Sequence, residues 1–118
     1  MSKPRTWDDI PGETVTPGHS RQAFRGDNLM VVRNLAEPGV GVEMHSHPHE
    51  QLVYIVRGQL EMHCRGEVHI LGPGSLYHIP GGEAHGGAPV GDEPCEIIDI
   101  FSPQREDFAH LVTYQDED

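Results

Sequence analysis

The chain has 118 residues and a formal net charge of −11 at pH 7. This length predicts a single domain covering 1–118, large enough to bury a two-layer core. Nucleic acids and anionic membranes are recognised by basic surfaces, so neither is expected as a partner. No apolar stretch approaches the ~20 residues that span a bilayer, and the first residues lack the apolar segment of a signal peptide. These features predict a cytoplasmic protein.

The first part of the chain differs in composition from the rest. Residues 1–20 contain three prolines and two glycines, which predicts an irregular N-terminal arm. The β-barrel core is expected over 29–103, and 104–118 is expected to form a C-terminal segment with a short helical or extended piece at 108–114. Candidate strands between glycine and proline turns cover 29–35, 41–47, 52–57, 59–65, 67–70, 75–79 and 95–101.

Alternating apolar residues support these strands. Leu60, Met62 and Cys64 share one face of their strand, and no stretch keeps a helical period. Short strands at this spacing predict an all-β antiparallel sandwich or barrel. The two cysteines, Cys64 and Cys95, form no CxxC pair and are expected to be reduced, buried thiols.

Histidine is enriched, with nine residues in the chain. His45 and His47 are two residues apart, so on a strand they project to the same face, where both can bind one metal ion. Gln51 has the parity of the apolar residues that follow it, and His85 comes just after a Pro-Gly-Gly turn. Taken singly, these are surface or loop histidines and a half-buried amide. Together, His45, His47, Gln51 and His85 predict a metal site with room for a substrate.

The last predicted strand carries an acid among apolar residues. Asp99 has the parity of Phe101, and a carboxylate on an apolar face is costly to bury unless it is paired or functional. Arg105 has the geometry to hold a substrate carboxylate through two hydrogen bonds. The plainer alternatives are that Asp99 faces solvent, Phe101 is core and Arg105 is a surface residue.

Three other polar residues lie near these motifs. His49 and Glu50 fall in the turn between two predicted strands, where a place at the rim of the site is expected. No role is assigned to His78, two residues before Pro80.

The chain resembles the two sequence motifs of the cupin superfamily over roughly 29–103. The matching residues read Gly39-x5-His45-x-His47-x3-Gln51-x6-Gly58 and Gly74-x5-Pro80-x-Gly82-x2-His85. The resemblance implies a double-stranded β-helix, the cupin jelly-roll barrel, with the metal held inside. The usual glutamate of the first motif is Gln51 here, and Pro89 replaces an asparagine of the second. A neutral ligand set leaves the full charge of a divalent ion to stabilise a developing oxyanion.

A narrower resemblance joins the run His45–Gln51 with the run 99–108. Together they resemble the KdgF-type cupins of pectin and alginate breakdown, which open the ring of 4,5-unsaturated monouronates. This resemblance implies four metal ligands (His45, His47, Gln51, His85) and three residues lining the site (Asp99, Phe101, Arg105).

The expected cofactor is one divalent ion, with Zn, Ni, Fe, Mn and Cu left open. The expected partner is a small-molecule carboxylate, and the resemblance also implies a homodimer. Two alternatives remain open: an Fe(II)-dependent dioxygenase, and a non-catalytic metal- or ligand-binding cupin. The sequence has no DNA-binding helix or basic face, which argues against a stand-alone regulator.

Overall fold

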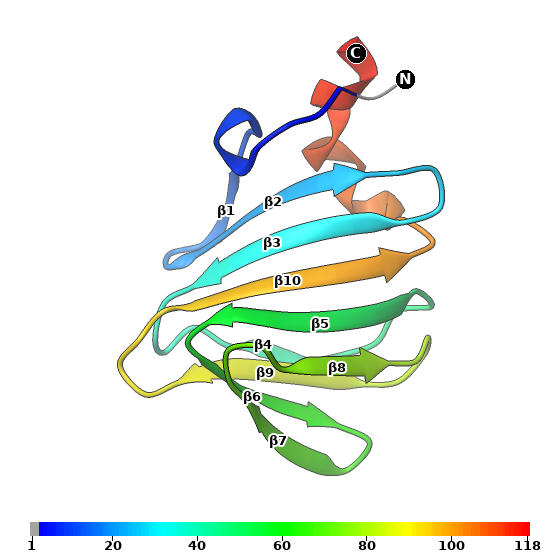
Figure 1. Cartoon of the computed structure of the whole chain (residues 1–118). Coiled ribbons are helices and arrows are strands. Elements are labelled where there is room, and N and C mark those ends of the chain that lie inside the picture. Colours follow the sequence, from blue (N-terminus) through cyan, green and yellow to red (C-terminus); the bar gives the residue numbers. More distant parts are fainter. Residues whose placement is uncertain (1–2) are drawn as a thin grey trace.

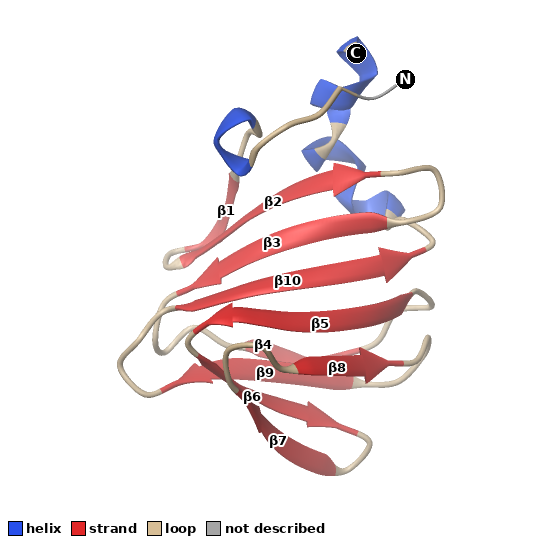
Figure 2. Ribbon diagram, in the orientation of Figure 1, coloured by secondary structure: helices blue, strands red, loops and turns tan. Residues whose placement is uncertain are grey.

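A computed structural model of the chain describes residues 3–118. Within this range the chain forms antiparallel strands with short 3-10 helices near both ends (Figure 1 and Figure 2). The strands are β1 (Glu13–Thr16), β2 (His19–Arg25), β3 (Met30–Ala36), β4 (Val42–His45), β5 (Glu50–Arg57), β6 (Gln59–Cys64), β7 (Glu67–Leu71), β8 (Leu76–Ile79), β9 (His85–Val90) and β10 (Cys95–Ser102). The 3-10 helices are η1 (Trp7–Asp9), η2 (Glu106–Leu111) and η3 (Thr113–Glu117).

The strands form two sheets that enclose the site. One sheet has six strands in the order β1-β2-β3-β10-β5-β8, and the other has four in the order β4-β9-β6-β7. Every pairing is antiparallel, and Figure 1 shows the two sheets as opposite sides of a barrel. The prediction of an all-β antiparallel barrel is confirmed.

The predicted irregular arm over 1–20 is wrong for much of its length. Residues 13–16 and 19–25 form β1 and β2, and β2 pairs with β3, so this hairpin adds two strands to the larger sheet. Pro17 and Gly18 are the turn of this hairpin rather than a sign of irregular structure, and Gly18 has a φ of 86°. Residues 1 and 2 of the predicted arm lie outside the described residues.

Strand β9 was also absent from the sequence predictions. Glycine has a low propensity for strands, but Gly86 and Gly87 each lie where the backbone of a neighbouring strand comes close. A Cβ on Gly86 would lie 2.8 Å from the carbonyl oxygen of Val42, and one on Gly87 would lie 2.8 Å from that of Glu61. The glycines therefore allow β9 to fit between β4 and β6.

Two apolar clusters fill the barrel, and they confirm the alternation seen in the sequence. One cluster joins the two sheets through residues such as Val53, Ile55, Met62 and Ile97. The other lies beneath the C-terminal helices, and its members are Ala23, Met30, Val32, Phe101, Leu111 and Val112. Cys64 and Cys95 are buried and unpaired, as predicted.

The C-terminal segment packs on the larger sheet. The Tyr114 hydroxyl donates a hydrogen bond of 2.5 Å to the backbone oxygen of Ala23 on β2. Arg5 pairs with Asp118, so the two ends of the chain lie together (Figure 1). Within residues 3–118 no helix has the length and apolar character needed to cross a membrane.

Candidate metal centre

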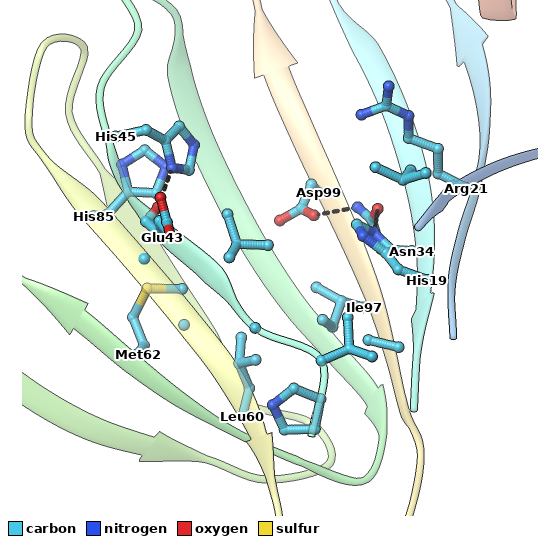
Figure 3. A pocket seen from close by; sticks show the side chains of 18 of the residues that line it. His19, Arg21, Asn34, Glu43, His45, Leu60, Met62, His85, Ile97 and Asp99 are labelled. Carbon is cyan, nitrogen blue, oxygen red and sulfur yellow. Dashed lines mark hydrogen bonds between the residues drawn. The ribbon is translucent and has the colours of Figure 1, made fainter. Parts of the chain in front are cut away.

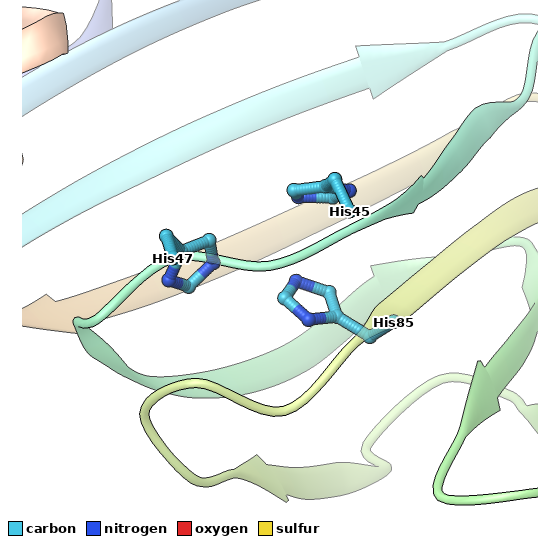
Figure 4. Close-up of side chains that lie close together, drawn as sticks. All are labelled: His45, His47 and His85. Carbon is cyan, nitrogen blue, oxygen red and sulfur yellow. The ribbon is translucent and has the colours of Figure 1, made fainter.

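Three histidines meet where β4 and β9 run side by side (Figure 4). His45 ends β4, His85 begins β9, and the two are register partners. His47 lies in the loop after β4, and its backbone oxygen accepts a hydrogen bond of 2.8 Å from the Gly82 amide. A Cβ on Gly81 would collide with the Pro48 carbonyl. The Pro-Gly-Gly turn can therefore pack directly against the His47 loop.

The three imidazoles lie close enough together that they could share one ion. One ring nitrogen from each lies within 4.8 Å of the others. Each Nδ1 lies close to a backbone oxygen: His45 with Glu43 at 2.9 Å, His47 with His49 at 3.1 Å, and His85 with Glu83 at 2.9 Å. A carbonyl only accepts, so each Nδ1 carries the proton and each Nε2 keeps its lone pair for a metal.

Burial favours the neutral form that a metal requires. His47 and His85 are buried, and this burial is the main reason that the pKa of each lies below the usual histidine value. Arg105 lowers both further through its charge. The two rings are therefore uncharged at neutral pH.

Gln51 extends this group from β5 on the larger sheet. Its Nε2 donates a hydrogen bond of 2.8 Å to Oδ1 of Asp99, which turns its amide oxygen toward the histidines. That Oε1 atom lies 3.1 Å from Nε2 of His47. Two ligands about 2.1 Å from one ion and at right angles lie about 3 Å apart. The three histidines and Gln51 are thus placed so that they could hold a divalent transition metal.

Asp99 is buried beside Gln51, with 8% of its surface exposed. The alternative of a solvent-facing acid is therefore wrong. Oδ2 of Asp99 accepts a hydrogen bond of 2.8 Å from Nδ2 of Asn34, as Oδ1 does from Gln51. Burial raises the pKa of Asp99 to about 6, although both hydrogen bonds and the charge of Arg105 oppose this rise.

Arg105 reaches the same cavity from the segment after β10. Its guanidinium carbon lies 5.0 Å from the ring centre of Phe101 and 4.2 Å from that of Phe108. Nε and Nη2 donate to the two carboxylate oxygens of Asp107, at 3.1 and 2.7 Å. Phe101 lies edge-on to His47 and also belongs to a core cluster, so it both lines the site and packs the core.

All of the predicted site residues except His47 line a cavity of about 530 Å³ between the two sheets. Figure 3 shows His45 and His85 on one side of it and Asp99 on the other. The opposite wall also holds His19, Arg21 and Asn34, which the sequence predictions did not single out. Asn34 alone carried a signal, since it is a polar residue with the parity of the buried Val32.

The three polar residues near the motifs lie in different places. His49 is buried, and its Nε2 lies 3.1 Å from Glu106. The backbone oxygen of His49 also accepts a hydrogen bond from Nδ1 of His47. Glu50 and His78 are exposed and form a pair of 2.8 Å on the outer surface. Among the three, His49 alone contacts a candidate ligand.

Comparison with known proteins shows which family the chain resembles in sequence and fold. A family model described as a cupin domain matches residues 34–101. The pectin degradation protein KdgF of Dickeya dadantii (strain 3937) is 32% identical over 103 residues, 86% of this chain and 93% of that protein. The structure of KdgF from Halomonas sp. is 30% identical with a TM-score of 0.81, covering 87% of this chain and 94% of that chain.

An RmlC-like cupin from Shewanella frigidimarina NCIMB 400 is 28% identical with a TM-score of 0.82, covering 88% of this chain and 93% of that chain. The family match spans more than half of the chain, and the relatives share its length and barrel. The chain belongs to the cupin family.

Proposed function

We propose that this chain is a metal-dependent enzyme that opens the ring of 4,5-unsaturated monouronates to a linear keto acid. The observation that carries the proposal is the buried carboxyl group of Asp99, held by two amide donors across the cavity from three convergent histidines. The similarity to KdgF proteins over nearly the whole chain supports a substrate from pectin or uronate degradation.

The proposed ligands are His45, His47, His85 and the amide oxygen of Gln51. A bound divalent ion would supply positive charge for the oxygen that becomes negative as the ring opens. All four ligands are neutral, so the protein does not reduce that charge. Zn, Ni, Fe, Mn and Cu all suit such ligands.

Asp99 is the proposed general base and acid. It takes the proton of the anomeric hydroxyl, the C1–O5 bond breaks, and C1 becomes an aldehyde. The electrons of the broken bond give C5 enolate character, and Asp99 returns a proton to C4, which leaves a ketone at C5. A carboxyl group with a pKa of about 6 suits both steps near neutral pH.

Arg105 is the proposed anchor for the substrate carboxylate. Asp107 occupies Nε and Nη2 of the guanidinium group, and within residues 3–118 no hydrogen bond involves Nη1. Arginine has five donors, so Nη1 can hold a second carboxylate. The stacking on Phe101 and Phe108 fixes the plane of the guanidinium group during this contact.

The test follows the ultraviolet absorbance of the C4=C5 bond in a 4,5-unsaturated monouronate. Protein of measured metal content should remove this absorbance faster than the spontaneous reaction, and a chelator should abolish the difference. No acceleration by fully loaded protein would contradict the proposal. Oxygen uptake with the same substrate would favour the dioxygenase, and tight binding without turnover would favour the ligand-binding cupin.

A further inference from the structure

A line of polar side chains crosses the inner face of the six-stranded sheet. His19, Asn34, Asp99 and Gln51 come from four neighbouring strands, β2, β3, β10 and β5, and we call them the polar diagonal. In each pairing the next member lies two residues from the position directly opposite. An offset of two keeps all four side chains on one face, within diagonal reach of one another.

Hydrogen bonds join the members in one unbroken chain. His19 Nε2 lies 2.8 Å from Asn34 Oδ1, and Asn34 Nδ2 lies 2.8 Å from Asp99 Oδ2. Asp99 Oδ1 lies 2.8 Å from Gln51 Nε2. The chain ends at Gln51 Oε1, which lies 3.1 Å from Nε2 of His47. The polar diagonal therefore links the β1–β2 hairpin to the candidate metal centre.

The direction of every bond in this chain is determined. An ionised carboxylate only accepts hydrogen bonds, so both amides must turn their nitrogens toward Asp99. Asn34 then presents its oxygen to His19, which must carry a proton on Nε2. Gln51 likewise presents its oxygen to the histidines. Loss of a hydrogen-bond donor at His19 or Asn34 can therefore change whether Gln51 turns its oxygen or its NH2 group toward the histidines.

We propose that His19 and Asn34 are positioning residues for the metal centre, acting through Asp99 to keep the Gln51 amide oxygen turned toward the ion. The inference rests on the ligand set of the proposed function. Without the Asn34 donor, Asp99 is held on one side alone and can rotate away from Gln51. The Gln51 amide can then turn its NH2 group, which is not a ligand, toward the histidines.

The test measures metal affinity, using Zn²⁺ in competition with a chromophoric chelator. Residues that orient metal ligands change metal affinity by about 10- to 100-fold when removed. Asn34→Leu should weaken Zn²⁺ binding within that range. His19→Phe, one step further away, should weaken it by roughly threefold to tenfold. Co²⁺ spectra of both variants should show an altered ligand field.

Two matched controls separate positioning from a structural contribution. Gln22→Leu removes an amide on β2 that bonds to the backbone of Trp7 and Ile10. His110→Phe removes an imidazole that contacts Glu13 at the surface. Both should lower the melting temperature of the metal-free protein at most, and leave Zn²⁺ affinity within about twofold, since neither touches the polar diagonal.

The decisive reference is Gln51→Leu. Weaker Zn²⁺ binding in Gln51→Leu together with unchanged binding in Asn34→Leu would overturn the inference, as would unchanged binding in Gln51→Leu itself. If Asn34→Leu does not fold, Asn34→Ala removes the donor without adding a bulky side chain and should weaken binding. A metal-loaded wild type without uronate turnover would overturn the proposed function alone, because the affinity measurements use no substrate.

Discussion

The two sides of the cavity are built in different ways. The histidine wall, formed by His45, His47 and His85, is oriented locally: each Nδ1 bonds to a backbone oxygen within two residues of its own position. The polar diagonal is oriented by bonds between side chains on different strands, such as that between Asn34 and Asp99. The orientation of each ring in the histidine wall therefore depends on a short segment, although the pairing of β4 with β9 brings His45 and His85 together. The polar diagonal depends on the register of four strands.

The largest effect is expected on the histidine wall. His47→Ala removes a buried proposed ligand and should weaken Zn²⁺ binding on the order of 100-fold or more, beyond the range for residues that only orient a ligand. Ring opening should disappear with the metal. Metal content and turnover of the purified variant check this, and His78→Ala, on the outer surface, is the control. Full occupancy in His47→Ala would remove His47 from the ligand set.

Asp99→Asn should distinguish the contribution of Asp99 to turnover from the contribution of the histidine wall. It keeps the size of a central member of the polar diagonal but cannot accept a proton, so turnover should fall by about 100- to 10,000-fold. An asparagine cannot accept from both Asn34 and Gln51, so Zn²⁺ affinity should also fall, and turnover is compared at saturating Zn²⁺ with the metal content of each protein measured. Stopped assays with the monouronate measure the rate. Wild-type turnover in a folded, metal-loaded variant would exclude Asp99 as base and acid.

A smaller effect is expected at Arg105, which lines the cavity. Lysine keeps the charge but loses the Nη1 donors and the planar group that stacks on Phe101 and Phe108, so Arg105→Lys should raise KM about tenfold with little change in kcat. Arg57→Lys, on an exposed position of β5, is the matched control. A fall in kcat with constant KM would show that Arg105 acts on the transition state rather than as an anchor.

The smallest effect concerns the β1–β2 hairpin at the end of the polar diagonal. Hydrogen bonds with Arg21 and then His110 hold the pKa of Glu13 below its usual value, although desolvation partly opposes them. This pairing stabilises the fold above the unfolded pKa near 4.5 and is lost as the pH falls through the folded pKa.

Because Glu13 is partly exposed, we expect Glu13→Gln to cost only a few tenths of a kcal/mol at pH 7. Urea unfolding of both proteins should give free energies that converge once the pH falls below the folded pKa of Glu13. A difference that persists there would mean that the charge of Glu13 is not its source.

The same contrast explains what the sequence could predict. His45, His47, Gln51 and His85 lie in two short motifs that resemble those of the cupin superfamily, and this resemblance predicted that they meet, although His45 and His85 are brought together by the pairing of distant strands. His19 and Asn34 have no such pattern, because their positions depend on strand pairing between residues far apart in the chain. The strand that carries His19 was also not predicted, because the Pro17-Gly18 pair before it is equally compatible with a loop and with a hairpin turn.

Strand β9 could not be predicted from the sequence either, because the reason for its glycines lies in packing against neighbouring strands. Its Gly86-Gly87 pair has low strand propensity, and only the close approach of Val42 and Glu61 explains why glycine is required. Burial of Asp99 was left open in the sequence, because parity alone does not reveal the two amide donors that stabilise it. A single sequence does not show which side chains on distant strands will form hydrogen bonds with each other.

We propose that Asp99, on the wall opposite the histidines, delivers the proton to C4 of the substrate. The most direct test is to run the reaction of the metal-loaded protein in D2O and determine by NMR where deuterium enters the product. Delivery from one fixed carboxyl group predicts deuterium on a single face of C4. Equal labelling of both faces, at a rate above the spontaneous one, would contradict the account.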